Sequence, residues 1–268
     1  MAVTPFQSGI LRSLADQRRR RGESYVAGGV ALNELLAAPR RSRDIDLFHD
    51  SETALAATWE ADGEALRGLG YTLEVIRLAP SFVEALVARG TDRSLMQWVR
   101  HSAFRFFPLI EDELLGLALH PFDLATNKVL AMAGRLEPRD WIDVLTRDAK
   151  LQPLGFLVWA ACGKDPGYNP VSLLGEMSRS HYSQAELDTL DFEGTPPVAA
   201  TLSIHWHEAL RSARAVCGAL PPGHLGTCVV TTDGQLFRGK ASDIGEAFES
   251  GRLGFHAGRI GGAWPSFR

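Results

Sequence analysis

The chain has 268 residues, of which 45% are hydrophobic and 22% are charged, as in an ordinary folded protein. This length can bury one large core or two smaller ones. The formal net charge of −4 excludes a general attraction to nucleic acid, although basic residues gather at Arg18–Arg21 and again at Arg40, Arg41 and Arg43.

The first 120 residues alternate between helical and strand patterns. Helices are predicted over 6–21, 30–38 and 51–69, strands over 25–27, 44–48, 71–78, 81–89 and 94–100, and a further apolar stretch covers 114–119. The first helix ends in the arginine run, where cations suit the helix dipole. Gly90-Thr91-Asp92 indicates a hairpin turn between two strands. This half of the chain has an α/β layout.

The second half is mostly helical. Helices are predicted over 121–134, 138–149, 171–179, 183–190 and 197–218. Near the end, Asp233-Gly234 between two short strand-like stretches predicts a hairpin over about 227–238. We therefore expect an α+β fold with two domains, a mixed sheet with helices in 1–120 and a mostly helical region in 121–268.

Cysteine usage and apolar runs suggest the compartment. Cys162, Cys217 and Cys228 are far apart and lack metal-binding or redox spacing, which is typical of a reducing environment. The N-terminal segment does not resemble a signal peptide. The strongest apolar run, 154–162, is too short to span a bilayer. We expect a cytoplasmic protein that does not associate with membranes.

A glycine pair and a carboxylate pair form the first candidate site. Gly28 and Gly29 lead into a helix, so that backbone N–H groups are open to a phosphate. Asp44 and Asp46 lie one residue apart on a strand, and alternation sends both side chains to the same face. Two such carboxylates can share Mg²⁺. A metal next to a phosphate cradle indicates nucleotide chemistry, whereas the simpler interpretation of the aspartates is a solvated polar face.

A second cluster of charges occupies the helices over 121–149. Lys128 and Arg135 are seven residues apart and share a helix face. Gly134 predicts a break in this helix. On the next helix, Asp140 and Asp143 also share a face. Such charges are costly to bury unless they pair or bind a ligand. The simpler interpretation of Arg135 is therefore an ion-pair partner for one of the aspartates.

Four segments together resemble a known family. They are Gly-Gly-Val-Ala-Leu-Asn at 28–33, Arg-Ser-Arg-Asp-Ile-Asp-Leu-Phe at 41–48, the lysine helix at 123–135 and Arg-Asp-Trp-Ile-Asp at 139–143. This order resembles the AbiEii/MenT-type nucleotidyltransferases of the DNA polymerase β-like superfamily, several of which are toxins of bacterial toxin–antitoxin or phage-defence systems. The resemblance covers roughly residues 6–150, and 151–268 carries no motif that we can place.

The resemblance implies transfer of a nucleoside monophosphate from an NTP such as ATP, with loss of pyrophosphate. In toxin members the usual acceptor is the 3′ end of tRNA, and a cognate antitoxin is a further expected partner. By position in the motifs, Asp44 and Asp46 would hold Mg²⁺, Lys128 would pair with phosphate oxygens, and Asp140 or Asp143 would complete the catalytic set. The implied nucleotide-binding residues are Gly28, Gly29, Ser42, Arg43, Lys128 and Arg135.

One position departs from the family pattern. A strand before the lysine helix often carries another carboxylate in relatives, where this chain has Gln97. Glutamine cannot be an anionic ligand or a general base, so Glu74 or Glu84 on neighbouring strands would have to substitute.

Two other functions stay open. One is a nucleotidyltransferase for a small molecule such as an aminoglycoside, and the other is a non-catalytic member that binds a nucleotide or a partner. An RNA acceptor predicts a basic groove that includes Arg18–Arg21, Arg41 and Arg43. The simpler interpretation of the arginine run is a solvated helix end.

Overall fold

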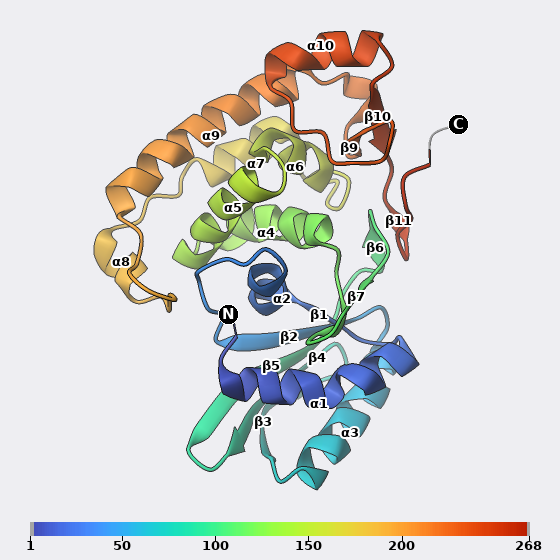
Figure 1. Cartoon of the computed structure of the whole chain (residues 1–268), viewed down its shortest axis with the longest axis vertical. Helices are drawn as coiled ribbons and strands as arrows, with labels where there is room; N and C mark the ends of the chain where they lie inside the picture. The colour runs from blue at the N-terminus through green and yellow to red at the C-terminus, as the bar shows by residue number, and fades with distance from the viewer. Residues whose placement is uncertain (1–2, 267–268) are drawn as a thin grey trace. The chain divides into compact units, whose positions relative to one another are not determined.

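The computed structural model describes residues 3–266, and the chain divides into two compact units. Unit 1 comprises Met1–Ala103, Leu109–His120 and Asp191–Gly194. Unit 2 comprises Phe104–Pro108, Pro121–Leu190 and Thr195–Arg268. The fold is α+β, as expected, with the main sheet in unit 1 and most of the helices in unit 2 (Figure 1).

Unit 1 is built on a seven-stranded mixed sheet with the order β3-β4-β5-β2-β1-β8-β7. Its strands are β1 (Tyr25–Ala27), β2 (Asp44–His49), β3 (Thr72–Ala79), β4 (Phe82–Arg89), β5 (Asp92–Arg100), β7 (Ile110–Asp112) and β8 (Gly116–Ala118). The β2–β5 and β1–β8 pairs are parallel, and the other neighbours are antiparallel. The five strands predicted before residue 101 and the β4–β5 hairpin are confirmed.

Three helices accompany this sheet, α1 (Pro5–Arg21), α2 (Gly28–Leu35) and α3 (Glu52–Gly68). The helix predicted over 51–69 is confirmed as α3, which begins after Ser51, whose hydroxyl accepts the Ala54 N–H. Trp98 of β5 packs edge-on against Trp59 of α3, with ring centroids 4.8 Å apart, and its indole N–H donates to Asp62 at 3.0 Å. Because strand side chains alternate, the residues next to Trp98 face the other side of the sheet.

Helix α2 differs from its predicted range of 30–38. It begins at Gly28 and ends at Leu35, and Ala37 then adopts a left-handed φ of 46°. The early start is possible because both first residues are glycines. The early end agrees with the proline at position 39, which disfavours helical backbone in the residue before it.

The arginine run at the end of α1 is only partly a solvated helix end. Arg18 is buried and donates to the Leu115 carbonyl at 2.5 Å, while Arg19 donates to the Asp112 carbonyl at 2.9 Å. Burial lowers the pKa of Arg18 to about 10, although nearby Asp62 opposes the shift. The expectation that Arg18 faces RNA or solvent is therefore wrong, and only Arg20 and Arg21 of the run are exposed.

Unit 2 is mostly helical and also contains two small two-stranded antiparallel sheets. Its elements are β6 (Phe104–Arg105), α4 (Pro121–Arg135), α5 (Pro138–Lys150), α6 (Leu154–Ala161), α7 (Pro170–Met177), α8 (Gln184–Asp188), α9 (Ala199–Ala219), a 3₁₀ turn (Pro222–His224), β9 (Cys228–Thr231), α10 (Ala241–Glu249), β10 (Leu253–His256) and β11 (Arg259–Ile260). A core cluster consists of Phe156, Trp159, Val216, Leu220, Val229, Ile244, Ala247 and Leu253. The five predicted helices are confirmed, whereas α6 and α10 were not predicted.

The apolar run near 154–162 is the buried helix α6. A Cβ on Gly155 would lie 3.0 Å from the Cα of Ala213 on α9, so the glycine permits close packing of the two helices. Among the described residues, none of the helices combines the length and the apolar character needed to cross a bilayer. The three cysteines have free thiols.

The predicted hairpin over 227–238 is only partly correct. Gly234 has a φ of 83°, and the Thr231 N–H donates to the Gln235 carbonyl at 2.8 Å, so the turn forms. The returning arm makes a single bridge, Val230↔Leu236, and is not a strand. Instead β9 pairs along its whole length with β10, a partner distant in sequence.

Candidate functional site

The glycine turn of unit 1 lies against one of the paired aspartates. Ala27 at the end of β1 is the antiparallel partner of Asp46 on β2. Gly28, the next residue, has a φ of 62°, and a Cβ built on it would overlap the Asp46 carboxylate. Helix α2 starts here, and its N-cap Ala27 provides no side-chain hydrogen bond. The N–H groups of the first turn therefore lie at a helix N-terminus that has no side-chain cap, where a bound anion would be stabilised.

Gly29 meets a different pair of side chains. A Cβ on Gly29 would lie 2.8 Å from the Ser42 Oγ and 2.9 Å from a terminal guanidinium nitrogen of Arg40. Both side chains are buried, and Arg40 also donates to the Arg41 carbonyl at 3.0 Å. Arg43 was predicted to bind nucleotide, and that stays a prediction; Arg40, which was not among the predicted site residues, is the arginine that lies beside Gly29. Arg43 is exposed, and the only sequence signal for Arg40 was its membership of the local basic group.

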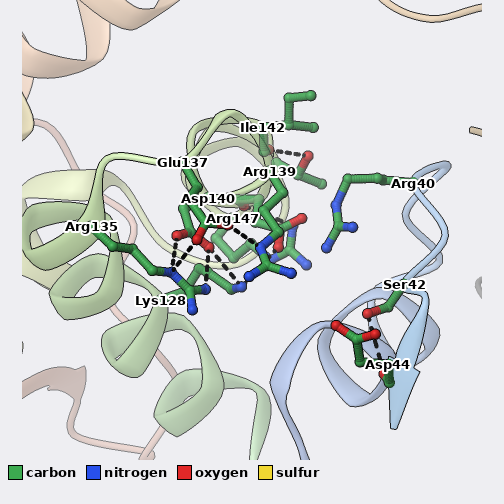
Figure 2. A network of polar contacts seen from close by, with 12 residues as sticks. Arg40, Ser42, Asp44, Lys128, Arg135, Glu137, Arg139, Asp140, Ile142 and Arg147 are labelled. Atoms are coloured by element: carbon green, nitrogen blue, oxygen red, sulfur yellow. Dashed lines mark hydrogen bonds and ion pairs between the residues drawn. The ribbon is translucent and has the colours of Figure 1, made fainter. Parts of the chain in front are cut away.

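The two aspartates share one face of β2, as the alternation predicted. Asp44 and Asp46 are half-buried, whereas Ile45 and Leu47 between and after them are fully buried. The Ser42 hydroxyl lies 3.4 Å from the Asp44 carbonyl oxygen (Figure 2). Both carboxylates therefore face away from the side of the sheet on which Trp98 packs against α3.

A row of polar side chains continues from Asp46 across the sheet. Asp46 is the parallel partner of Gln97 on β5, and Gln97 is the antiparallel partner of Glu84 on β4. The Gln97 amide donates to the Glu84 carboxylate at 2.7 Å. Glu74 instead lies opposite Leu86 on the outermost strand, so Glu84 is the carboxylate that accompanies Gln97.

The donor set at Asp44 and Asp46 fits Mg²⁺. Magnesium is usually held by one or two carboxylates, with waters and substrate phosphates completing its octahedron. Among residues 3–266 there is no group of three or more His, Cys, Asp or Glu side chains placed to hold a metal by themselves. A cation at this position would therefore depend on the two aspartates and on a bound phosphate.

The second predicted cluster is assembled within unit 2. The Lys128 ammonium lies 2.9 Å from the Asp140 Oδ1 and 3.1 Å from the Asp143 Oδ2. Arg135 binds the same Asp140 through two nitrogens, at 2.7 and 3.0 Å (Figure 2). Both carboxylates are almost completely buried, and Lys128 is 8% exposed. Lys128 is therefore not an ordinary surface lysine.

The connection between α4 and α5 brings these groups together. The helix continues through Gly134, and the chain turns at Leu136, which has a left-handed φ of 50°. The predicted break at Gly134 is therefore two residues early. Such a φ is costly for a residue with a Cβ. It places Pro138 at the start of α5 and Asp140 in its first turn, where the helix dipole favours a carboxylate.

Electrostatics in the cluster favour the ionised form of Asp140. Burial would raise the pKa of Asp140, but the hydrogen bond from Arg135 and the charges of Lys128 and Arg135 outweigh burial and lower it. Asp143 has a further cationic neighbour in the buried Arg147. The Arg147 Nη1 lies 3.9 Å from the Asp143 carboxylate and donates to the Asp143 carbonyl at 2.7 Å.

Asp123, at the start of the lysine helix, has a structural environment. Its two carboxylate oxygens accept the N–H groups of Phe106 and Phe107 at 2.9 and 3.0 Å. The buried Lys164 ammonium lies 2.8 Å from Asp123 and donates to Asn127. These contacts fix α4, and therefore Lys128, within unit 2.

The fold is similar to that of a nucleotidyltransferase of known structure. The chain is similar in structure to MenT4, nucleotidyltransferase toxin Rv2826c from Mycobacterium tuberculosis H37Rv, with a TM-score of 0.51 and 15% identity over 81% of this chain and 85% of that one. A putative nucleotidyltransferase from H. pylori also matches, with a TM-score of 0.42 and 15% identity over 78% and 93% of the two chains. No protein-family model and no curated protein matches the sequence.

Proposed function

We propose that the protein is a nucleotidyltransferase that moves a nucleoside monophosphate from an NTP to an acceptor hydroxyl. The observation that supports this most directly is the Gly28 turn, which opens a helix N-terminus beside the Asp46 carboxylate. A phosphate site and a carboxylate pair then lie together within one unit. The nucleotidyltransferase fold agrees with this chemistry.

In the proposed reaction, the acceptor oxygen forms a bond to the α-phosphorus as the bond to the bridging oxygen of pyrophosphate breaks. The hydroxyl proton leaves to a base or to solvent. The N–H groups at Gly28 and Gly29 bind phosphate oxygens, and Arg40 and Ser42 flank them. Asp44 and Asp46 would hold Mg²⁺, which would neutralise charge on the triphosphate when bound.

The unit 2 cluster supplies the second group of proposed residues. Lys128 contacts phosphate in this proposal, and its ion pairs with Asp140 and Asp143 hold its ammonium in place. Arg135 holds Asp140 and is the most exposed member, with 43% of its side chain accessible. We therefore assign Arg135 to nucleotide contact and the two aspartates to positioning of Lys128.

We further propose RNA, and most specifically a tRNA 3′ end, as the acceptor, in a protein that acts as a toxin controlled by an antitoxin in the cytoplasm. The support is the likeness to MenT4, a nucleotidyltransferase toxin, and the exposed Arg20, Arg21 and Arg43 in unit 1. Arg18 does not belong to any such basic surface because it is buried.

The test is incubation with Mg²⁺, each labelled NTP and total tRNA. We expect label on RNA from the wild type, and at least a hundredfold less from Asp46→Asn. Asp92→Asn, an exposed carboxylate on the same sheet, is the matched control and should label normally. Equal labelling by wild type and Asp46→Asn would contradict the site assignment.

The same assay separates the alternatives. Pyrophosphate release with an aminoglycoside, but not with RNA, would favour a small-molecule enzyme. Nucleotide binding without pyrophosphate release for any acceptor would favour the non-catalytic member that Gln97 makes conceivable.

A further inference from the structure

The outer strand of the unit 1 sheet presents an apolar free edge. β3 pairs with β4 on one side and ends the sheet on the other. Exposed large apolar side chains gather here, with Leu69 51%, Val75 45%, Ile76 56% and Leu78 68% accessible. Lysine and proline are two of the residues that protect such edges, and Thr72–Ala79 contains neither, although it carries a bulge and two charged side chains.

A β-bulge near the middle of β3 changes which side chains share a face. Val75 lies opposite Ala85 and Arg77 lies opposite Glu84, so the register shifts between them and Ile76 is the additional residue. In a regular strand, residues 74 and 77 would point to opposite faces. Here their partners on β4 are Leu86 and Glu84, two residues apart, so Glu74 and Arg77 lie on the same face.

The strand is self-complementary about this bulge. Read outward from the bulge, one arm is Val-Glu-Leu-Thr from position 75 back to 72, and the other is Ile-Arg-Leu-Ala from position 76 to 79. A two-fold axis perpendicular to a sheet pairs two copies of a strand antiparallel and keeps each face with itself. An axis through the bulge would place Glu74 of each copy opposite Arg77 of the other. On the opposite face, Leu73 would meet Leu78.

We propose that two copies of this chain associate through their β3 edges, forming one sheet with seven strands from each copy. Ladder hydrogen bonds, two Glu74–Arg77 pairs and two leucine pairs stabilise the contact. The charge pattern favours a second copy of this chain as the partner. When two β3 strands run antiparallel about the bulge, Glu74 of each copy lies opposite Arg77 of the other. A single strand edge is a small interface, so the dimer is reversible and concentration-dependent.

The experiment is sedimentation velocity of the full chain from low to several hundred micromolar, where we expect a monomer–dimer equilibrium. Glu74→Arg and Arg77→Glu each place like charges opposite one another twice. Each variant alone should therefore weaken association by at least about tenfold. An equimolar mixture of the two variants restores opposite charges at both positions and should dimerise about as well as the wild type.

Controls separate the edge from general effects of charge and folding. Arg93→Glu changes an exposed arginine elsewhere on the same sheet and should leave association unchanged. Arg77 also stacks on the Phe82 ring at 5.1 Å, so circular dichroism must show that Arg77→Glu is folded. Glu74→Arg tests the proposal independently of that contact.

Hydrogen exchange gives a second readout, because amides of Thr72–Ala79 should exchange more slowly as concentration rises. A chain that stays monomeric throughout the range would overturn the proposal. So would a dimer that neither charge reversal weakens. Neither result depends on whether the protein transfers nucleotides.

Discussion

The Asp46 carboxylate occupies the space into which any side chain on Gly28 would project. The contact joins two segments that are eighteen residues apart in sequence, the start of α2 and the middle of β2. A glycine is needed at this turn for two separate reasons. Its φ of 62° is left-handed, and the Asp46 carboxylate leaves no room for a Cβ. The N-terminal end of α2 and the Asp46 carboxylate therefore cannot be changed independently.

Gly28→Ala should remove most activity by displacing Asp46. We expect at least a hundredfold loss of nucleotide transfer and a loss of about 1–3 kcal/mol in the free energy of unfolding, because the new Cβ is both strained and crowded. Gly68→Ala is the matched control, since Gly68 ends helix α3 and a Cβ added there would have no heavy atom within 4 Å. If Gly28→Ala were as active as the control, Asp46 would not need its present position.

Gln97→Glu should make stability depend on a divalent cation. The change places a third carboxylate between Asp46 and Glu84, which are its neighbours on the two adjacent strands. Without metal, we expect like-charge repulsion to lower the free energy of unfolding by about 1 kcal/mol. Adding Mg²⁺ with an NTP should restore more stability to the variant than to the wild type.

Thermal unfolding in EDTA and in Mg²⁺ checks this prediction. Gln97→Leu is the control, because it also removes the hydrogen bond to Glu84 but adds no charge. A variant that responds to Mg²⁺ no more than this control would show that the cation does not bind next to position 97.

Lys128→Met should destabilise the protein more than Arg135→Met. Lys128 is 8% exposed and joins two buried carboxylates, so removing its charge should cost about 3–5 kcal/mol. Arg135 is far more exposed, so we expect a loss of about 1 kcal/mol. Urea unfolding at neutral pH measures both values.

The pH dependence of the Lys128→Met deficit is a further check. The Lys128 charge helps to lower the pKa of Asp140. Without that ammonium, Asp140 binds a proton more readily in the folded state, so the deficit should shrink as the pH falls toward about 5. A deficit that is constant with pH would indicate lost packing and not lost charge.

His49 should make the protein less stable in mild acid. Burial lowers the pKa of His49 to about 4, and the nearby Arg18 lowers it further, while its hydrogen bond to the Val99 carbonyl and the Asp50 charge oppose the shift. The unfolded state, with an ordinary pKa near 6.5, binds the proton first. Stability is therefore complete above about pH 6.5 and falls as the pH drops toward about 4, by up to about 3 kcal/mol.

Urea unfolding of the wild type and His49→Gln at about pH 7.5, 6 and 5 tests this contribution. The stability of the wild type should fall more steeply, and the difference between the two proteins should change across this range. Parallel pH profiles would show that His49 is protonated equally in the folded and unfolded states.

Much of the candidate site was predictable because it depends on local spacing. The strand alternation that puts Asp44 and Asp46 on one face needs only a two-residue period. The helical period likewise predicted that Lys128 and Arg135 share a face, as do Asp140 and Asp143. Their pairing across the α4–α5 turn followed because the connection between the two helices is short.

Tertiary structure decided where each of several similar residues lies. Arg40, and not Arg43, lies beside Gly29, and Arg18 is buried while Arg20 is exposed. Composition could not separate these arginines, because each choice depends on the segment that packs over it.

The local β4–β5 hairpin was predictable, whereas strand partners distant in sequence were beyond the sequence pattern. β9 pairs with the distant β10 in preference to the adjacent arm of its turn, and the bulge at Ile76 has no signal in the alternation of β3. Local periodicity determines where a side chain points along its own element. Long-range pairing depends on burying apolar surface and satisfying backbone hydrogen bonds across the whole unit, and only the folded chain reveals the outcome.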